Sequence, residues 1–166
     1  MVASVAKEYD LIVIEDGFSA LLTDQPGEAI FRRAPEQGIF FLSLSKSISP
    51  ALRQSYIAAG ERYRSRIADA IYNINLDQSG LLMEISARLI LSERFEHLIM
   101  RRREILRQRN AIAEAVLGKY ELHGGAEALC KWLVLPRRLR GEELEKEALA
   151  RNVSLYGAEH FAVGKE

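Results

Sequence analysis

The chain has 166 residues, 48% of them hydrophobic and 28% charged, which is typical of a soluble globular protein with one domain or two small ones. Because 23 basic residues balance 23 acidic ones, the net charge is zero and gives no long-range attraction for nucleic acid, and no apolar run is long enough to span a membrane. The N-terminus lacks a signal-peptide pattern and a single cysteine excludes an intrachain disulfide, so we expect a cytoplasmic protein in which Cys130, beside Trp132, is a core residue.

Aliphatic runs in the first third of the chain predict strands of an α/β fold. Leu11–Ile14 is followed by Glu15 and Asp16, and the run predicts a buried parallel strand. A second strand is predicted over Ile39–Leu44, and residues 23–38 between the two, with two prolines and two glycines, predict a loop. Because ligands bind at the carboxyl ends of such strands, we expect Asp16 and the residues after the second strand to meet at one edge.

Short-range periodicity predicts the remaining elements as far as the middle of the chain. Tyr56–Ala59 predicts a third strand that ends at a glycine. Beyond it, apolar residues at spacings of three and four predict helices over Tyr63–Ile74, from Ser79 to Ile90, and over Ser92–Leu117. The last of these is long enough to link two parts of the molecule, and Gly118 ends it.

The long helix carries a cluster of arginines, and arginine-rich helices can bind the phosphates of nucleic acids. Three glutamates share the helix, so ion pairs and water are sufficient to explain the cluster. We therefore interpret it as a solvated face and expect no nucleic-acid contact. The arginines are Arg101, Arg102, Arg103, Arg107 and Arg109, and the glutamates are Glu96, Glu104 and Glu114.

The last third of the chain predicts a small α/β unit. Ala128–Leu135 predicts a strand that ends at a proline, Gly141–Arg151 a helix with three glutamates near its start, and Val153–Tyr156 a further strand. The three histidines of the chain lie in different segments without the spacing of metal ligands, so no metal site is expected.

The segment SLSKSISPALRQSY, residues 43–56, carries the strongest chemical signal. A lysine amine condenses with an aldehyde only in its unprotonated form, which partial burial favours, and Lys46 directly follows an apolar run. The hydroxyls of Ser43 and Ser45 can donate to phosphate oxygens, and Arg53, seven positions after the lysine, can bind a phosphate through two parallel hydrogen bonds. The segment predicts a site for a phosphorylated aldehyde; the alternative is a solvated lysine in a serine-rich turn.

The same residues, SLSKSISPALRQSYI, resemble the cofactor-lysine segment of fold-type I aminotransferases that use pyridoxal phosphate (PLP). The version with this lysine–arginine spacing is typical of the aminotransferase-like domains of MocR regulators in the GntR family and of the aminoadipate and kynurenine aminotransferase group. Upstream, YDLIVIEDGF resembles the family's strand that ends in an aspartate, and here Asp16 lies thirty positions before Lys46. Downstream, ERFEHLIMRRREILRQRN and HGGAEALCKWLVLP resemble its long helix and the strand after it, so the resemblance covers nearly the whole chain.

The resemblance implies a role for each residue of the site. Lys46 would hold PLP as a Schiff base and act as the general base, and Asp16 would pair with the protonated pyridine nitrogen. Ser43, Ser45 and Arg53 would anchor the phosphate. Phe18 stands where the family usually has a tyrosine, so one hydrogen bond to the cofactor is missing.

The resemblance also implies how the chain is organised. Residues 1–91 would be the C-terminal part of a PLP-binding large domain with a mostly parallel sheet, residues 92–118 a connecting helix, and residues 119–166 an incomplete small α/β domain. The first half of the large domain would be missing, so the fragment alone is expected to be inactive.

Three functions remain open at this point. The first is transamination between an amino acid and a 2-oxo acid in an intact homodimer, in which Asn75–Ser79 is a candidate to reach the cofactor of the neighbouring subunit. The second is a non-catalytic, ligand-sensing effector domain of a MocR-type regulator. The third is a structural fragment with neither role.

Overall fold

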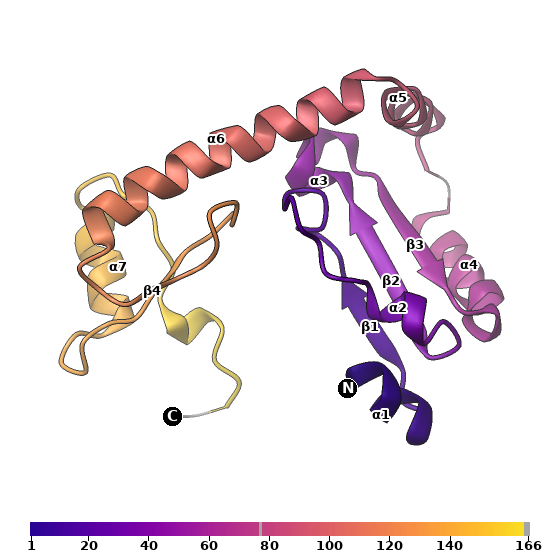
Figure 1. Cartoon of the computed structure of the whole chain (residues 1–166), viewed down its shortest axis with the longest axis horizontal. Coiled ribbons are helices and arrows are strands. Elements are labelled where there is room, and N and C mark those ends of the chain that lie inside the picture. Colours follow the sequence, from indigo (N-terminus) through magenta and orange to yellow (C-terminus); the bar gives the residue numbers. More distant parts are fainter. Residues whose placement is uncertain (77, 165–166) are drawn as a thin grey trace. The chain divides into compact units, whose positions relative to one another are not determined.

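The computed structural model describes residues 1–76 and 78–164, and the chain forms two compact units (Figure 1). Unit 1 contains residues 1–110 together with residues 126–129, and unit 2 contains residues 111–125 together with residues 130–166. The chain therefore passes between the units three times. The domain boundaries at residues 91 and 118 stay a prediction.

Unit 1 is built on a sheet of three strands in the order β1-β2-β3. β1 (Val13–Asp16) pairs in parallel with β2 (Gly38–Ser43), and β2 pairs antiparallel with β3 (Ser55–Ala59). The predicted α/β class and all three strands are confirmed, although the sheet is mixed, with one parallel and one antiparallel pair. The predicted burial of the first strand is wrong, because Ile14 is 67% exposed.

Several short helices near the sheet were not predicted, and two of them precede β2. α1 (Val2–Glu8) precedes β1, and α2 (Ile30–Arg33) interrupts the segment that was predicted to be a loop. Both span no more than two helical turns, which is too short for apolar periodicity to show in the sequence. α2 contacts both β1 and β2, and it thereby closes the crossover between the two parallel strands.

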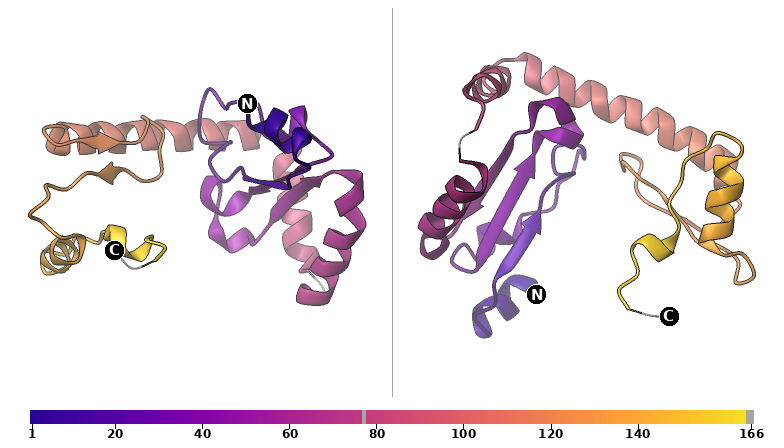
Figure 2. Two further views of the ribbon diagram at one scale, coloured as in Figure 1. Left: turned by 90° about the horizontal axis from the view of Figure 1, so that it is seen from below. Right: turned by 180° about the vertical axis from the view of Figure 1, so that it is seen from behind.

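The three predicted longer helices are confirmed as α4 (Glu61–Asn75), α5 (Gly80–Ile90) and α6 (Arg94–Leu117). Ser79 caps α5, since its Oγ accepts a hydrogen bond from the third residue of that helix. Figure 2 shows α6 as one continuous helix from two directions. No helix among the described residues is apolar over a length that could cross a bilayer. The core of unit 1 is small: Ala6, Leu22, Ala34, Leu44, Tyr63, Ile99 and Leu106.

Unit 2 has less regular structure than its sequence predicts. Of the predicted strand Ala128–Leu135 only β5 (Trp132–Leu133) forms, paired with the unpredicted β4 (Leu122–His123). The predicted helix is present as α7 (Gly141–Leu149). Val153–Tyr156 is not a strand, because among the described residues of unit 2 no strand pairs with it, and the short 3₁₀ helix η2 (Ala158–His160) follows.

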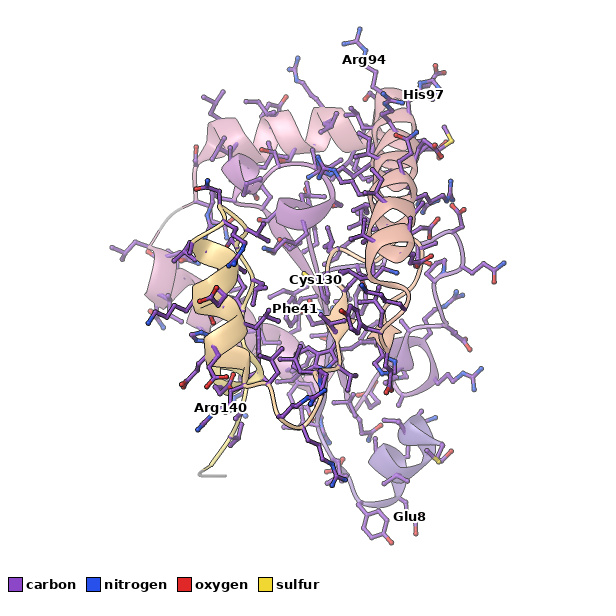
Figure 3. All side chains as sticks on the ribbon, turned by 90° about the vertical axis from the view of Figure 1, so that its left-hand side faces the viewer. Glu8, Phe41, Arg94, His97, Cys130 and Arg140 are labelled. Carbon is purple, nitrogen blue, oxygen red and sulfur yellow. The ribbon has the colours of Figure 1, made fainter. Side chains whose placement is uncertain are left out.

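The position of Cys130 differs from the expectation that it is a core residue. Its side chain, labelled in Figure 3, is exposed, and the neighbouring Trp132 is 49% exposed. The interpretation of Cys130 as a core residue is therefore wrong in this chain. Trp132 makes an edge-on contact with Phe161 instead, with ring centroids 6.1 Å apart.

Candidate active site

The candidate site lies at the carboxyl ends of β1 and β2. In the parallel register Asp16 is paired with Phe41, and the backbone N–H of Gly17 donates to the carbonyl of Phe41 at 2.8 Å. β2 then leads directly into α3 (Leu44–Ser47), which carries Lys46, and Figure 1 shows α3 at that end of the strand. The fold thus brings Asp16 and Lys46, thirty positions apart in sequence, to one edge of the sheet.

Asp16 presents a carboxylate that is only partly engaged. Its Oδ1 accepts a hydrogen bond from the backbone N–H of Phe18 at 3.0 Å, and within residues 1–76 and 78–164 no donor reaches its second oxygen. Phe18 itself is 42% exposed and offers no polar group. An exposed carboxylate with a free oxygen suits a cationic N–H partner such as a protonated ring nitrogen.

Gly17 lets the backbone after Asp16 approach the sheet closely. A Cβ at this position would lie 2.4 Å from Cζ and 2.6 Å from Cε2 of the Phe40 ring. No real Cβ contact is that short, so any larger residue would displace the ring or the backbone. The absence of a side chain at Gly17 therefore allows the chain after Asp16 to pass close to the Phe40 ring.

α3 is capped by a serine, and it buries two of its side chains while its lysine is exposed. Ser43 Oγ accepts from the backbone N–H of Ser45 at 3.2 Å as the helix cap, which leaves its own hydrogen free to donate. Leu44 and Ser47 are buried, whereas Lys46, between them, is exposed. The predicted partial burial of Lys46 is therefore not found in this chain, and no carboxylate of the described residues pairs with it.

Arg53 occupies a strained position next to α3. It follows the 3₁₀ helix η1 (Pro50–Leu52), which contacts α3, and its backbone is left-handed with φ 51° and ψ 28°. That conformation costs a non-glycine residue about 1–2 kcal/mol. The next residue, Gln54, is buried and accepts from the backbone N–H of Leu44 at 3.1 Å, which holds the turn in place. Among the described residues, no acidic side chain pairs with the Arg53 guanidinium.

The chemistry of these groups matches the parts of PLP. Lys46 is an amine for the aldehyde, and Asp16 is a carboxylate for the ring nitrogen. The remaining three residues offer the hydroxyl and guanidinium donors that a phosphate dianion prefers, and no acidic side chain among the described residues neutralises the two cations. The residues present therefore fit the cofactor.

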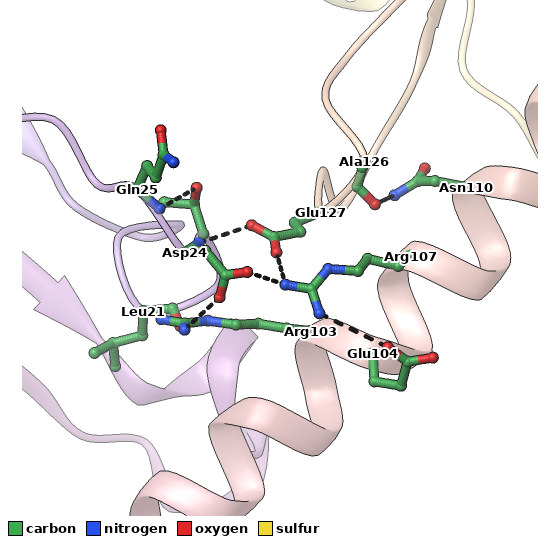
Figure 4. A network of polar contacts seen from close by, with 10 residues as sticks. Leu21, Asp24, Gln25, Arg103, Glu104, Arg107, Asn110, Ala126 and Glu127 are labelled. Carbon is green, nitrogen blue, oxygen red and sulfur yellow. Dashed lines mark hydrogen bonds and ion pairs between the residues drawn. The ribbon is translucent and has the colours of Figure 1, made fainter.

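A network of charged side chains in unit 1 was missed by the sequence analysis (Figure 4). Arg103 donates to Leu21 O at 3.1 Å and to Asp24 Oδ1 at 2.8 Å, and Arg107 donates to Asp24 Oδ2 and, at 2.5 Å, to Glu127 Oε1. The solvated-face interpretation is therefore wrong for these two arginines. No signal in the sequence identifies the partners of Arg103, because they lie 79 and 82 positions away.

The network sets the charge of its most buried carboxyl. Glu127, whose side chain is 14% exposed, accepts from the backbone N–H of Asp24 at 2.8 Å. That hydrogen bond first, and the Arg107 guanidinium second, hold the pKa of Glu127 below its usual value, against the opposing effect of burial. Glu127 is thus kept ionised as an acceptor for both partners.

An apolar cavity of about 490 Å³ lies elsewhere in unit 1, between β3 and α4. Phe31, Ile57, Ile67 and Ile71 are among the residues that line it, and none of the predicted site residues does. Its polar lining consists of Ser55 and Arg64, Arg64 pairs with Glu61, and no lysine of the described residues lines it that could react with an aldehyde. We therefore place the candidate chemistry at the sheet edge and not in this cavity.

Comparison with known proteins relates the chain to a regulator. No protein-family model matches it. Over 164 residues it is 41% identical to an uncharacterized HTH-type transcriptional regulator, YdeF, of Bacillus subtilis (strain 168). The alignment covers 99% of this chain and 36% of that protein, so the chain spans about a third of the length of this relative.

Solved aminotransferase structures are similar to the chain in fold. An aromatic aminotransferase from Pyrococcus horikoshii OT3 superposes with a TM-score of 0.86 at 18% identity, over 98% of this chain and 46% of the other. LysN, an alpha-aminoadipate aminotransferase from Thermus thermophilus solved with N-(5'-phosphopyridoxyl)-L-leucine, gives a TM-score of 0.78 at 23% identity, over 92% and 42%. These likenesses confirm the predicted fold.

Proposed function

We propose, on the premise that this chain has the fold of part of a PLP-dependent aminotransferase, that it forms one side of a PLP site in a longer protein. The observation that carries the proposal is the placement of Asp16 and Lys46 at the carboxyl ends of two paired parallel strands, next to unpaired donors. The main candidate activity is transamination between an amino acid and a 2-oxo acid.

Each residue then has a defined task. Bound PLP supplies an aldehyde that reacts with amines and a ring that accepts electrons. Lys46 Nζ would hold the aldehyde carbon and would accept or donate the proton at the substrate Cα. Asp16 would keep the proton on the ring nitrogen through its free oxygen. Phe18 would contact the ring without a hydrogen bond, which costs about 0.5–1.5 kcal/mol relative to a tyrosine.

Ser43, Ser45 and Arg53 would hold the phosphate and thereby orient the cofactor. Ser43 has a hydrogen left to donate after capping α3, and the backbone next to Arg53 is held by Gln54, which is buried. Anchoring at the phosphate would orient the aldehyde toward Lys46, so that the two groups react from a positioned arrangement.

A second candidate function is favoured by the relative among regulators. A domain that is 41% identical to part of an HTH-type regulator could bind PLP and an amino acid as signals without releasing a product. The longer protein is proposed to be a homodimer in either case. The predicted segment Asn75–Ser79, offered as a contact to a neighbouring subunit, includes Asp77, which lies outside the described residues.

The test of cofactor binding is covalent trapping at Lys46. PLP is added to the chain, the mixture is reduced with borohydride, and the site of the adduct is located by peptide mass spectrometry. We expect labelling at Lys46, none in Lys46→Ala, and unchanged labelling in Lys7→Ala, which removes another lysine of unit 1. Equal labelling of the wild type and Lys46→Ala would contradict the proposal.

The two candidate functions differ in the step after binding. In the longer protein, an aminotransferase produces a 2-oxo acid from an amino acid on repeated turnover, whereas a sensor changes its absorption spectrum and releases no product. For the 166-residue chain alone we expect weak PLP binding and no turnover. Sustained 2-oxo acid formation by the longer protein would exclude the sensor.

A further inference from the structure

We propose that Arg103 and Arg107 are positioning residues for the candidate PLP site, because they fix the far end of the loop that begins at Asp16. This inference rests on the proposed function for its role, although the loop and its contacts exist without a cofactor. We refer to Asp24, Arg103, Arg107 and Glu127 as the clasp.

The loop after Asp16 is a chain of successive turns. Gly17 N–H bonds back to β2, the N–H of Ala20 donates to Gly17 O at 2.9 Å, and the N–H of Leu22 donates to Ser19 O at 2.8 Å. Leu22 is 1% exposed and anchors the middle of the loop in the core. Because each turn shares residues with the next, few backbone torsions are free to change, and a displacement at one end of the loop also moves the other end.

The clasp holds the other end of this loop. Arg103 binds the backbone at Leu21 and the side chain of Asp24, and Arg107 binds the second oxygen of the same carboxylate. Arg103 is 21% exposed at its side chain, so its bonds are partly protected from water. Neither arginine contacts Asp16, and each acts on it through the loop.

The clasp is itself fixed from the opposite side. Glu127 accepts from Arg107 and from the backbone N–H of Asp24, and it belongs to residues 126–129, the segment that returns to unit 1. The amide of Asn110, 6% exposed, donates to the carbonyls of Ala126 at 2.8 Å and Ala128 at 2.9 Å. The segment is therefore held on α6 on both sides of Glu127, and the clasp has a rigid base.

The first measurement needs no cofactor. Amide hydrogen exchange of residues 17–25 is compared between the wild type, Arg103→Gln, Arg107→Gln and Asp24→Asn. We expect exchange in the three variants to be faster by about 2- to 30-fold, the range for coupling through packed and hydrogen-bonded networks. Arg101→Gln, which removes an exposed arginine of the same helix, is the matched control and should match the wild type.

The second measurement uses PLP as the probe, with affinity and absorption maximum as readouts. Because Asp16 is expected to pair with the ring nitrogen, a displaced loop should weaken PLP binding by a similar factor and shift the absorption maximum, and the spectral shift is an effect that a loss of stability alone does not produce. Arg107→Lys, which keeps the charge, should restore part of the affinity.

The outcomes separate this inference from the proposed function. Unchanged exchange in the clasp variants overturns it, and so does faster exchange with wild-type affinity and spectrum. If the wild type binds no PLP, the proposed function fails together with the positioning role, while the exchange data still decide whether the arginines fix the loop. Faster exchange with weaker, spectrally shifted binding supports the inference.

Discussion

Substitutions at Arg53 can separate the free-energy cost of its left-handed backbone from the proposed role of its guanidinium in phosphate binding. Its φ of 51° is disfavoured by about 1–2 kcal/mol for any residue with a Cβ, while glycine adopts it freely. Glycine in turn loses about 0.4–1 kcal/mol more than alanine through the flexibility of the unfolded chain. We therefore expect Arg53→Gly to be more stable than Arg53→Ala by between about zero and 1.6 kcal/mol.

Binding of PLP should instead fall to the same extent in the two variants. Both variants lack the guanidinium, and loss of hydrogen bonds to a charged phosphate costs about 1.5–3 kcal/mol, or roughly 10- to 150-fold in PLP affinity. The assay is urea unfolding followed by circular dichroism, with PLP titration on the same samples. Arg32→Ala, on α2, is the control for loss of one positive charge in unit 1.

Two results would refute this reasoning separately. If Arg53→Gly is less stable than Arg53→Ala, the left-handed backbone is not a source of strain in the folded chain. If either variant binds PLP as tightly as the wild type does, Arg53 is not a phosphate ligand.

Two further predictions concern packing and pH. In Gly17→Ala the new methyl group would overlap the ring of Phe40, so the free energy of unfolding in urea should fall by about 1–3 kcal/mol. Gly27→Ala is the control, because a Cβ there meets nothing within 4 Å and should not lower the stability in this way. Equal stability of the two variants would contradict the clash. In unit 2 the backbone N–H of Gly157, at 3.0 Å, is the largest cause of a lowered pKa of Glu145. Because the folded-state pKa of Glu145 is below the unfolded one, this contribution to stability is present at neutral pH and is lost as the pH falls through and below the ordinary value of 4.5. The stability of Glu145→Gln, measured by thermal unfolding, should therefore depend less steeply on pH in that range than the stability of the wild type. An unchanged slope would count against this prediction.

The candidate site could be predicted from sequence because its parts are local. Ser43, Ser45, Lys46 and Arg53 lie within eleven residues, and the turn that presents them depends on bonds between near neighbours. The meeting of Asp16 with this turn required only that two aliphatic strands run in parallel.

The clasp and the strands of unit 2 could not be predicted in the same way. The predicted strand Val153–Tyr156 has suitable residues but lacks a neighbouring strand to pair with among those described, and strand formation depends on that partner. Exposure of Lys46 likewise depends on what surrounds α3 in three dimensions, which its own sequence does not specify.

The sequence by itself therefore determined the longer helices, the strands of unit 1 and the candidate groups for binding a phosphorylated aldehyde, because apolar periodicity, helix caps and turn residues act over a few positions. Only the tertiary structure decided which arginines of α6 are paired and which face solvent. Arg103 reaches Asp24 across 79 positions, and the free energy of that contact depends on how distant segments pack against each other and on how much water they exclude.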